Sequence, residues 1–241
     1  MPKEYKIPNN LIQFWHDKNI LPNPYAKIQE NNEKYTLNFK KFFIDDIYMY
    51  DFFKNNSYLL EVYKRLKVES IRSDIVRLVM LYEYGGIYMD MSMQLHTNLD
   101  DIIDKYKDIV LLQRDDQPRY AKYPQKAHIA AGIIAAVPKS SFIKCCLSHL
   151  IDTIVKGHYN HHILFAATKY TNDIYIKYLE NKHIDFDMQL LSFKKLKEYH
   201  LTHHRLPGLA NSWKAYEVDG IFDYKDIEFL QKNYIPLNCS F

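Results

Sequence analysis

Residues 72–90 constrain the fold of this chain more than any other part of its sequence. The first half of this segment is mostly apolar with helical spacing, and Gly85 and Gly86 follow it directly. A glycine at this place commonly ends a helix in a left-handed conformation. The apolar run 87–89 then predicts a short strand, with Asp90 at its end. The segment therefore predicts a site at the edge of a sheet, where a strand presents a carboxylate. The apolar positions that support the helix are Ile71, Ile75, Leu78, Val79 and Tyr82.

Asp74 and Arg77 interrupt this apolar helix, and their spacing of three residues places them on one helical face. A buried charge without a partner costs several kcal/mol, so each of the two must be paired or bind something. Two interpretations stay open. The two side chains pair with each other inside a structural helix, or they face a polar ligand with Asp90 beside them.

These residues resemble the motif of the nucleotide-sugar-dependent DXD glycosyltransferases, which runs R-S-D-x-x-R and then G-G-x-Y-x-D-x-D. That superfamily includes mannosyltransferases, bacterial capsular polysaccharide synthesis transferases and the catalytic domains of clostridial glucosylating toxins. The matching residues are Arg72, Ser73, Asp74, Arg77, Gly85, Gly86, Tyr88 and Asp90.

Two further blocks are similar to the same family. Residues 7–15 resemble its I-P-K-I-I-H-Q-I-W opening strand, with Ile12 in place of the family's histidine. A block near the end of the chain is similar to the element H-H-x-x-x-S-W, with a longer spacing between its halves. It consists of His203, His204, Ser212 and Trp213.

The resemblance implies a role for each matching residue at the donor. Trp15 would stack on the nucleobase, with Gln13 beside it in the same strand. Asp74 and Arg77 would bind hydroxyls of the donor sugar, and Tyr88 would lie against the ribose. For Trp15, Tyr88 and Trp213 the competing interpretation is packing in the core, because large aromatic side chains mostly serve that purpose.

The resemblance also implies a divalent cation, Mn²⁺ or Mg²⁺, at the diphosphate. Asp90 would bridge sugar and ribose or a metal-bound water. The family's second aspartate, its direct metal ligand, is replaced here by Ser92, and a hydroxyl is a poorer ligand than a carboxylate. Metal affinity should therefore be reduced, with Asp90, Ser92 and His203 as the expected ligands. His203, Ser212 and Trp213 would close over the diphosphate, although a solvated loop is the competing interpretation for His203.

The pattern along the chain predicts one α/β domain over residues 1–241, with a GT-A-like, mostly parallel central sheet flanked by helices and a small helical annex. Helices are expected at 25–31, 44–54 and 142–155, besides the one before Gly85. Strands are expected at 11–15, 35–39, 87–90, 109–113, 132–137, 188–191 and 216–218.

Composition excludes several classes of protein. The net charge of +3 forms no basic block, so we expect no nucleic-acid partner. No run approaches the roughly 18 apolar residues of a membrane span, and the first ten residues are too polar for a signal peptide. We therefore expect a cytoplasmic protein, with at most peripheral association at the inner face of the cell membrane. Cys145, Cys146 and Cys239 lack metal-binding spacing and are expected to be reduced thiols. The pair Asp115 and Asp116 either orients an acceptor hydroxyl or is simply solvated.

The resemblance favours a hexosyltransferase that uses a nucleotide diphosphate sugar, UDP-linked, and retains the anomeric configuration. The expected acceptor is a glycan or lipid-linked glycan in bacterial capsule or lipopolysaccharide synthesis. Two alternatives stay open: a protein-modifying transferase of the toxin or effector type, and an inactive protein that binds a nucleotide sugar. The sequence leaves the oligomeric state open.

Overall fold

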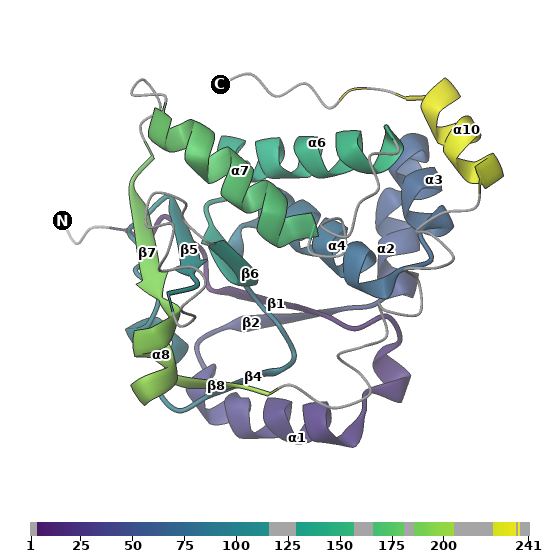
Figure 1. Ribbon diagram of the computed structural model, residues 1–241. Helices are drawn as coiled ribbons and strands as arrows, with labels where there is room; N and C mark the ends of the chain where they lie inside the picture. Colours follow the sequence, from purple (N-terminus) through teal and green to yellow (C-terminus); the bar gives the residue numbers. More distant parts are fainter. Residues whose placement is uncertain are drawn as a thin grey trace.

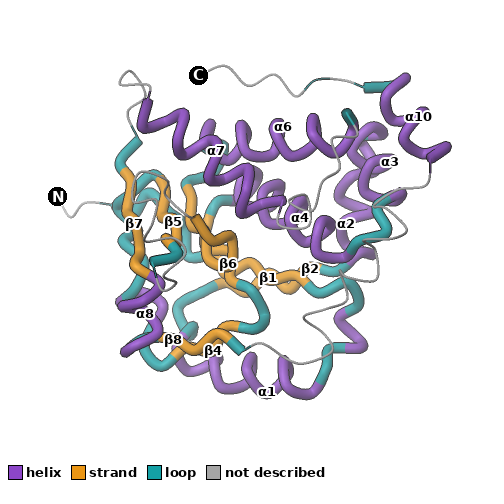
Figure 2. The backbone as a smooth tube through the Cα atoms, viewed as in Figure 1, coloured by secondary structure: helices purple, strands orange, loops and turns teal. Residues whose placement is uncertain are grey.

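The computed structural model describes residues 4–115, 129–156, 166–180, 186–204, 224–234 and 236 (Figure 1). The strands gather in the middle of the molecule, with helices above and below them in the view of Figure 2. This arrangement is the expected α/β architecture, in which helices bury the two faces of a sheet.

A six-stranded sheet forms the centre, in the order β2-β1-β3-β6-β5-β7. Strand β6 is antiparallel to both of its neighbours, whereas the pairs β1–β2, β1–β3 and β5–β7 are parallel. The expectation of a mostly parallel sheet is therefore confirmed. The strands are β1 (Asn10–Phe14), β2 (Lys40–Ile44), β3 (Gly86–Met89), β5 (Ile109–Gln113), β6 (Ile129–Ala136) and β7 (Met188–Ser192). A separate antiparallel pair consists of β4 (Met93–Leu95) and β8 (Leu201–His203).

Short polar side chains start several of the helices. Asp45 accepts a hydrogen bond from the Tyr48 amide at 2.8 Å, and Asn56 accepts one from the Leu59 amide at 3.1 Å, as N-cap residues do. The α-helices are α1 (Asn23–Asn32), α2 (Asp46–Phe52), α3 (Ser57–Arg65), α4 (Glu69–Tyr84), α6 (Ser141–Val155), α7 (Ala166–Glu180), α8 (Phe193–Tyr199) and α10 (Tyr224–Lys232). Short 3₁₀ helices are η1 (Lys18–Ile20), η2 (Glu33–Tyr35), η3 (Phe53–Asn55) and η4 (Leu99–Asp101).

The sheet separates two hydrophobic cores, because successive side chains of a strand point to opposite faces. In β3, Tyr88 belongs to the core that contains α4 and α6, whereas Ile87 and Met89 belong to the core on the other face. That second core also contains apolar residues of β4, α8 and β8. In Figure 1, α4, α6 and α7 lie on one side of the sheet, and α1 lies on the other beside β4 and β8.

Gly85 and Gly86 make the sharp passage from α4 into β3. Their φ angles are 60° and 112°, in the region that favours glycine. A Cβ at Gly85 would lie 2.6 Å from Pro138, and one at Gly86 would lie 2.5 Å from the Asn10 carbonyl oxygen. A side chain at Gly85 would therefore clash with Pro138, and one at Gly86 would clash with Asn10, besides straining the backbone. The expected end of the helix at these glycines is confirmed.

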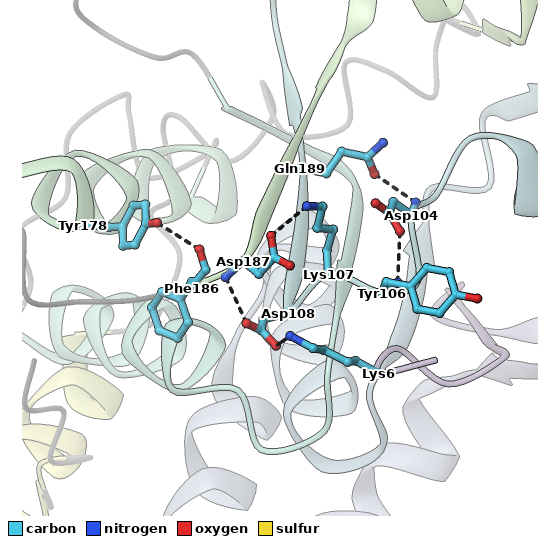
Figure 3. Close-up of polar contacts among 9 residues, drawn as sticks. All are labelled: Lys6, Asp104, Tyr106, Lys107, Asp108, Tyr178, Phe186, Asp187 and Gln189. Atoms are coloured by element: carbon cyan, nitrogen blue, oxygen red, sulfur yellow. Dashed lines mark hydrogen bonds and ion pairs between the residues drawn. The ribbon is translucent and has the colours of Figure 1, made fainter. Parts of the chain in front are cut away.

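A polar network ties β7 to β5 where both strands start, at the edge of the sheet opposite to Asp90 (Figure 3). The Asp108 carboxylate accepts hydrogen bonds from Lys6 Nζ and from the Asp187 amide, each at 2.9 Å. Lys107 Nζ donates to the Asp187 carboxylate at 2.7 Å. Exposed ion pairs add little stability each, but together these contacts fix which residues of β5 and β7 lie opposite each other.

One expected strand is wrong. Residues 35–39 contain the end of η2 and a turn, and the second strand is β2, which begins at Lys40. Strand β2 lies at the edge of the sheet and exposes Lys40, Lys41 and Phe43, so it lacks a clear alternation of apolar and polar residues. The expected strand 216–218 lies outside the described residues. The other expected strands and helices are confirmed within a few residues.

No helix in the described part of the chain is long and apolar enough to cross a bilayer. Cys146 is a buried free thiol, and burial raises its pKa. Cys145 is disulfide-bonded, so the expectation of a reduced thiol is wrong for this residue. Spacing along the chain does not show which thiols meet in the fold. Cys239 lies outside the described residues.

Candidate functional site

The first residue of the R-S-D-x-x-R motif anchors α4 to α2. Arg72 Nη1 donates to a carboxylate oxygen of Asp46 at 2.6 Å, and the Tyr63 hydroxyl donates to the other oxygen, also at 2.6 Å. Burial raises the pKa of Asp46, while the Tyr63 hydrogen bond and the Arg72 charge oppose that shift. Arg72 therefore fixes the start of α4.

Asp74, Arg77 and Asp90 form a charged cluster between the middle of α4 and the end of β3. Arg77 Nη2 lies 3.2 Å from Asp74 Oδ1 and 3.4 Å from Asp90 Oδ1. The side chains of Asp74 and Arg77 are 9% and 8% exposed, whereas that of Asp90 is 31% exposed. The structure shows the pairing of Arg77 with Asp74 and also brings Arg77 to Asp90, whereas a polar ligand facing these charges stays a prediction. Of the three, Asp90 is the group that a ligand can approach from solvent.

The Arg77 guanidinium is held by protein acceptors on several sides. Its Nη1 donates to the Ala131 carbonyl oxygen at 2.5 Å, and its Nη2 donates to Ser73 Oγ at 3.1 Å. The guanidinium carbon lies 4.5 Å from the centre of the Tyr88 ring, a cation–π distance. Arg77 therefore connects α4 with β3 and β6. Its expected contact with a sugar hydroxyl stays a prediction.

Tyr88 is buried under Arg77, and its hydroxyl lies 3.1 Å from Ser73 Oγ. Burial raises the pKa of Tyr88; Arg77 opposes this shift, and Asp90 adds to it. For Arg77, burial alone would lower the pKa, but Tyr88, Asp90 and Asp74 outweigh it and raise the pKa. The guanidinium is therefore a permanent positive charge beside Asp90. The structure shows Tyr88 in a packing role, and its contact with a ribose stays a prediction.

The Asp90 backbone is fixed by its neighbours in the sheet and the following turn. Its amide donates to the Gly132 carbonyl oxygen at 2.9 Å, and its own carbonyl accepts from the Met93 amide at 3.0 Å. Strand β3 thus ends at Asp90, which leaves the carboxylate at the carboxyl edge of the parallel strands, as expected.

Trp15 follows β1 at this same edge and packs against α1. Its ring lies 5.1 Å from that of Tyr25, edge to face, and Trp15 packs against the small apolar cluster that contains Tyr25 and Met91. Burial raises the pKa of Tyr25, and the negative charge of Asp90 adds to this shift. Gln13 donates to Gln29 Oε1 at 2.7 Å. Trp15 is half-buried, which is compatible with stacking on a base as well as with packing.

Ser92 meets the histidine pair in the fold although His203 and His204 follow it by 111 and 112 positions in the sequence. The His204 amide donates to the Ser92 carbonyl oxygen at 2.9 Å, and His203 lies opposite Met93 in the β4–β8 ladder. The His203 ring lies 6.2 Å from that of Phe193. Within the described ranges, no three His, Cys, Asp or Glu residues are placed to hold a metal ion. The expected metal ligands Asp90, Ser92 and His203 therefore stay a prediction.

Other expected site residues are not brought into this cluster. Ser212, Trp213 and Asp116 lie outside the described residues. Asp115 accepts hydrogen bonds from the Ser192 hydroxyl and, at 2.8 Å, from the Lys194 amide. It therefore ties the start of α8 to the end of β5, which explains its charge without an acceptor sugar.

Three further residues contribute to the site. Ser73 bridges Arg77 and Tyr88, and its place inside the R-S-D-x-x-R motif was the available signal. Gly132 faces Asp90, and the run of small residues around it was the signal. Tyr25 had no signal, because an aromatic residue on a helix usually indicates core packing.

Comparison with known proteins finds sequence matches over part of the chain. Residues 8–108 match the family described as "Glycosyltransferase sugar-binding region containing DXD motif". The chain is also 35% identical over 100 residues to the "Uncharacterized glycosyltransferase L373" of Acanthamoeba polyphaga mimivirus. That match covers 40% of each of the two chains, so it spans less than half of this relative's length.

A solved structure shares the fold over more of the chain. The structure titled "PaToxG Glycosyltransferase" superposes with a TM-score of 0.54, covering 94% of this chain and 78% of its own. Sequence identity is 15%, so this likeness supports the fold alone. The family match contains Trp15, Asp74, Arg77 and Asp90, the residues that the structure gathers at one edge of the sheet.

Proposed function

We propose that this chain, whose residues 8–108 match the family of DXD-containing glycosyltransferase sugar-binding regions, transfers a hexose or N-acetylhexosamine from a nucleotide diphosphate sugar to a glycan acceptor. One observation carries the proposal. Within the matched region, the partly exposed Asp90 ends a strand and pairs at 3.4 Å with the buried Arg77.

The fixed charges of this cluster suit a donor with a diphosphate leaving group. Transfer breaks the bond between sugar C1 and the phosphate oxygen, which keeps the electron pair, and forms a bond from C1 to an acceptor hydroxyl oxygen. Negative charge therefore grows on the diphosphate and positive charge on the sugar ring. A preorganised carboxylate at Asp90 stabilises the positive sugar, provided that its own position is fixed by Arg77 and β6.

Arg77 has a positioning role in this proposal. Its Nη2 has Ser73, Asp74 and Asp90 as acceptors within 3.4 Å, so little of its hydrogen-bonding capacity is free for substrate. It holds the carboxylates of Asp74 and Asp90 in place before the reaction begins, so they need not move during it. Asp74, at 9% exposure, is the second carboxylate that a donor hydroxyl reaches once the ligand is bound.

The residues around Asp90 fit a weakly held Mg²⁺ or Mn²⁺. Asp74, Arg77 and Asp90 together carry a formal charge of −1, so the site is not closed to a cation. Asp90 and Ser92 offer oxygen ligands, which these metals prefer, and such metals commonly complete their shell with phosphate oxygens and water. A bound cation would supply charge stabilisation of the leaving diphosphate. Holding the donor and excluding water remain tasks of the protein.

Trp15 supports the nucleotide end of the proposal. It follows β1 at the same edge of the sheet at which Asp90 follows the parallel strand β3, so in this proposal the donor extends from Trp15 toward Asp90 and Ser92. UDP as the carrier, retention through a front-face reaction, and the acceptor proton passing to the leaving phosphate are parts of this proposal. The setting in bacterial capsule or lipopolysaccharide synthesis stays a prediction, since the named relative is viral.

Two alternatives stay open. The toxin or effector type is compatible with the fold shared with the PaToxG glycosyltransferase structure, a likeness that bears on the fold alone. An inactive binding protein is favoured by Ser92, where the family motif has an aspartate. Donor hydrolysis or transfer separates the second alternative from the other two.

The test is a panel of nucleotide sugars, each with and without Mn²⁺. Binding is read as thermal stabilisation, and turnover as release of the nucleoside diphosphate. The proposal predicts that one donor both stabilises the protein and is turned over. Stabilisation without turnover by any donor and acceptor would favour the inactive binding protein, and no stabilisation by any nucleotide sugar would contradict the proposal.

A further inference from the structure

Three successive carbonyl groups that follow Asp90 are held by distant parts of the chain. The Met91 carbonyl accepts from Gln29 Nε2 at 2.9 Å, and the Met93 carbonyl accepts from Asn32 Nδ2 at 2.8 Å. The carbonyl between them, that of Ser92, accepts from the His204 amide. The turn that carries Ser92 is thus held on two sides, by α1 and by the segment after β8.

The contacts from α1 come from one helical face. Tyr25, Gln29 and Asn32 are spaced by four and three residues, so they form a single stripe along the helix. Tyr25 packs on Met91, and Asn32 also accepts from the Leu95 amide at 2.7 Å. The amide of Asn32 therefore pairs with β4 as a neighbouring strand would. Figure 1 shows α1 running beside β4.

Gln29 also makes a hydrogen bond to strand β1. Its Oε1 accepts from Gln13 Nε2 at 2.7 Å, while its Nε2 donates to Met91. Gln13 lies in β1, two residues before Trp15. The single amide of Gln29 therefore joins the strand that presents Trp15 to the turn that presents Ser92. A nucleotide diphosphate would have to span these two places.

We infer that Gln29 is a positioning residue, which fixes the distance between the nucleobase end and the diphosphate end of the donor site; this inference rests on the proposed function. Gln29 acts through Gln13 and through the Met91 carbonyl, and it touches no reacting atom. When its two hydrogen bonds are lost, the turn is free to move while Trp15 keeps its own packing. Nucleotide binding should then survive better than turnover, since small displacements of reacting groups penalise the chemical step most.

The test compares Gln29→Met, which keeps the length of the side chain and removes both hydrogen bonds, with Glu30→Gln. Glu30 is exposed on the same helix and serves as the matched control. Three quantities are measured: hydrogen exchange of the segment 91–95, binding of UDP followed by tryptophan fluorescence, and kcat and KM for the donor found in the panel. For Gln29→Met we expect faster exchange in this segment, a fall in kcat of about tenfold to hundredfold, and an unchanged affinity for UDP. Glu30→Gln should match the wild type in all three.

A second variant removes only one of the two hydrogen bonds of Gln29. It keeps the test decisive if Gln29→Met fails to fold. Gln29→Glu keeps an acceptor for Gln13 but faces the Met91 carbonyl with an oxygen in place of the NH₂ group. It should resemble Gln29→Met in exchange and in kcat. If the segment 91–95 exchanges at the wild-type rate in both variants, Gln29 does not hold the turn. If exchange is faster but kcat stays at the wild-type value, Gln29 holds the turn but does not position the donor. If the wild-type protein turns over no donor, the proposed function fails and the positioning role falls with it, while the exchange rates still decide whether Gln29 holds the turn.

Discussion

Gly132 lies so close to Asp90 that a methyl group on Gly132 would come within 3.0 Å of a carboxylate oxygen of Asp90. The same methyl would lie 2.4 Å from the terminal carbon of Met93. Both contacts are made by the ends of side chains, which can move while the backbone of β6 stays in place. The position of the Asp90 carboxylate is therefore set in part by the absence of a side chain at Gly132.

The variant Gly132→Ala should displace Asp90 and leave the protein folded. We expect donor turnover to fall by about tenfold to hundredfold, since misplacement of a catalytic group by about 1 Å has an effect of this size. The melting temperature should fall by about 2–4 °C for each kcal/mol of packing lost. Steady-state kinetics and thermal melting measure the two effects. The double variant Gly132→Ala, Met93→Ala relieves only the contact with Met93, so a return of full activity in it would contradict the role of Asp90.

Asp90→Asn keeps the shape of the side chain and removes its charge. Turnover should fall by roughly tenfold to a thousandfold, the scale of losing one electrostatic contact to a developing charge. Because the Asp90 side chain is 31% exposed, melting should change little. Asp51→Asn, at an acid whose side chain is 75% exposed and pairs with Lys54, is the matched control. Wild-type transfer by Asp90→Asn would show that the site lies elsewhere.

Ser92→Asp restores a carboxylate at the family's metal-ligand position. If the cation is held beside Asp90, this variant should bind Mn²⁺ more tightly than the wild type, because carboxylate oxygens are the stronger ligands. Ser92→Ala, which removes the hydroxyl, should bind it no better than the wild type. Calorimetric titration of the three proteins with Mn²⁺ makes the comparison. Equal or weaker affinity in Ser92→Asp would place any metal away from this turn.

Trp15→Ala should weaken binding of the nucleoside diphosphate by roughly 1–3 kcal/mol, the value of stacking one base on an aromatic ring. Trp15→Phe should lose less, because it keeps a ring against Tyr25 and Met91. The chain has two tryptophans, so fluorescence of the remaining one follows binding. Tight binding by Trp15→Ala together with a much lower melting temperature would show that Trp15 serves packing alone.

Alkaline pH should destabilise the fold through buried tyrosines. Burial raises the pKa of Tyr63 and of Tyr88 above the ordinary value near 10. Above pH 10 the unfolded chain loses phenolic protons that the folded chain keeps, so the free energy of unfolding falls as pH rises. Each such phenol contributes about 1.4 kcal/mol per pH unit. Below pH 10 the folded and unfolded chains both keep these protons, so the free energy of unfolding no longer depends on pH through these phenols.

Urea unfolding at several pH values from 8 to 11, followed by tyrosinate absorbance, checks this expectation. Tyrosinate should form in part together with unfolding. Ionisation of all 21 tyrosines near pH 10 in the folded protein would contradict it.

The central part of the site could be predicted because its signals are local. The helix α4, the glycine stop and the strand β3 follow one another along the chain, and each has a steric or hydrophobic cause that sequence shows. Strand β5 also agrees with its expected bounds, because it is a continuous apolar run buried on both faces. The pairing of Arg77 with Asp90 follows from the same segment, since thirteen residues separate them.

The remaining contacts could not be predicted because their partners are far apart in sequence. Gln29 and Asn32 belong to a polar stretch that is typical of a solvated helix, and only the fold places them against Met91 and Met93. The contact between His204 and Ser92 could not be predicted for the same reason. Strands β4 and β8, which bring them together, are three residues long and have no strong apolar pattern. Asp115 shows a further contact that the sequence does not reveal, because it holds the start of α8 across a long separation in sequence.

The central strand β6 has a consequence for how this protein acquires its site during folding. Its residues follow the family-matched segment 8–108 in sequence, yet β6 lies between β3 and β5 and supplies the carbonyls that Asp90 and Arg77 bind. A chain that has been synthesised only to residue 108 therefore contains all the residues of the segment 72–90 but lacks β6, which lies next to β3 in the finished sheet. The motif is therefore complete early in synthesis, whereas the site requires long-range contacts with the second half of the chain, which form slowly.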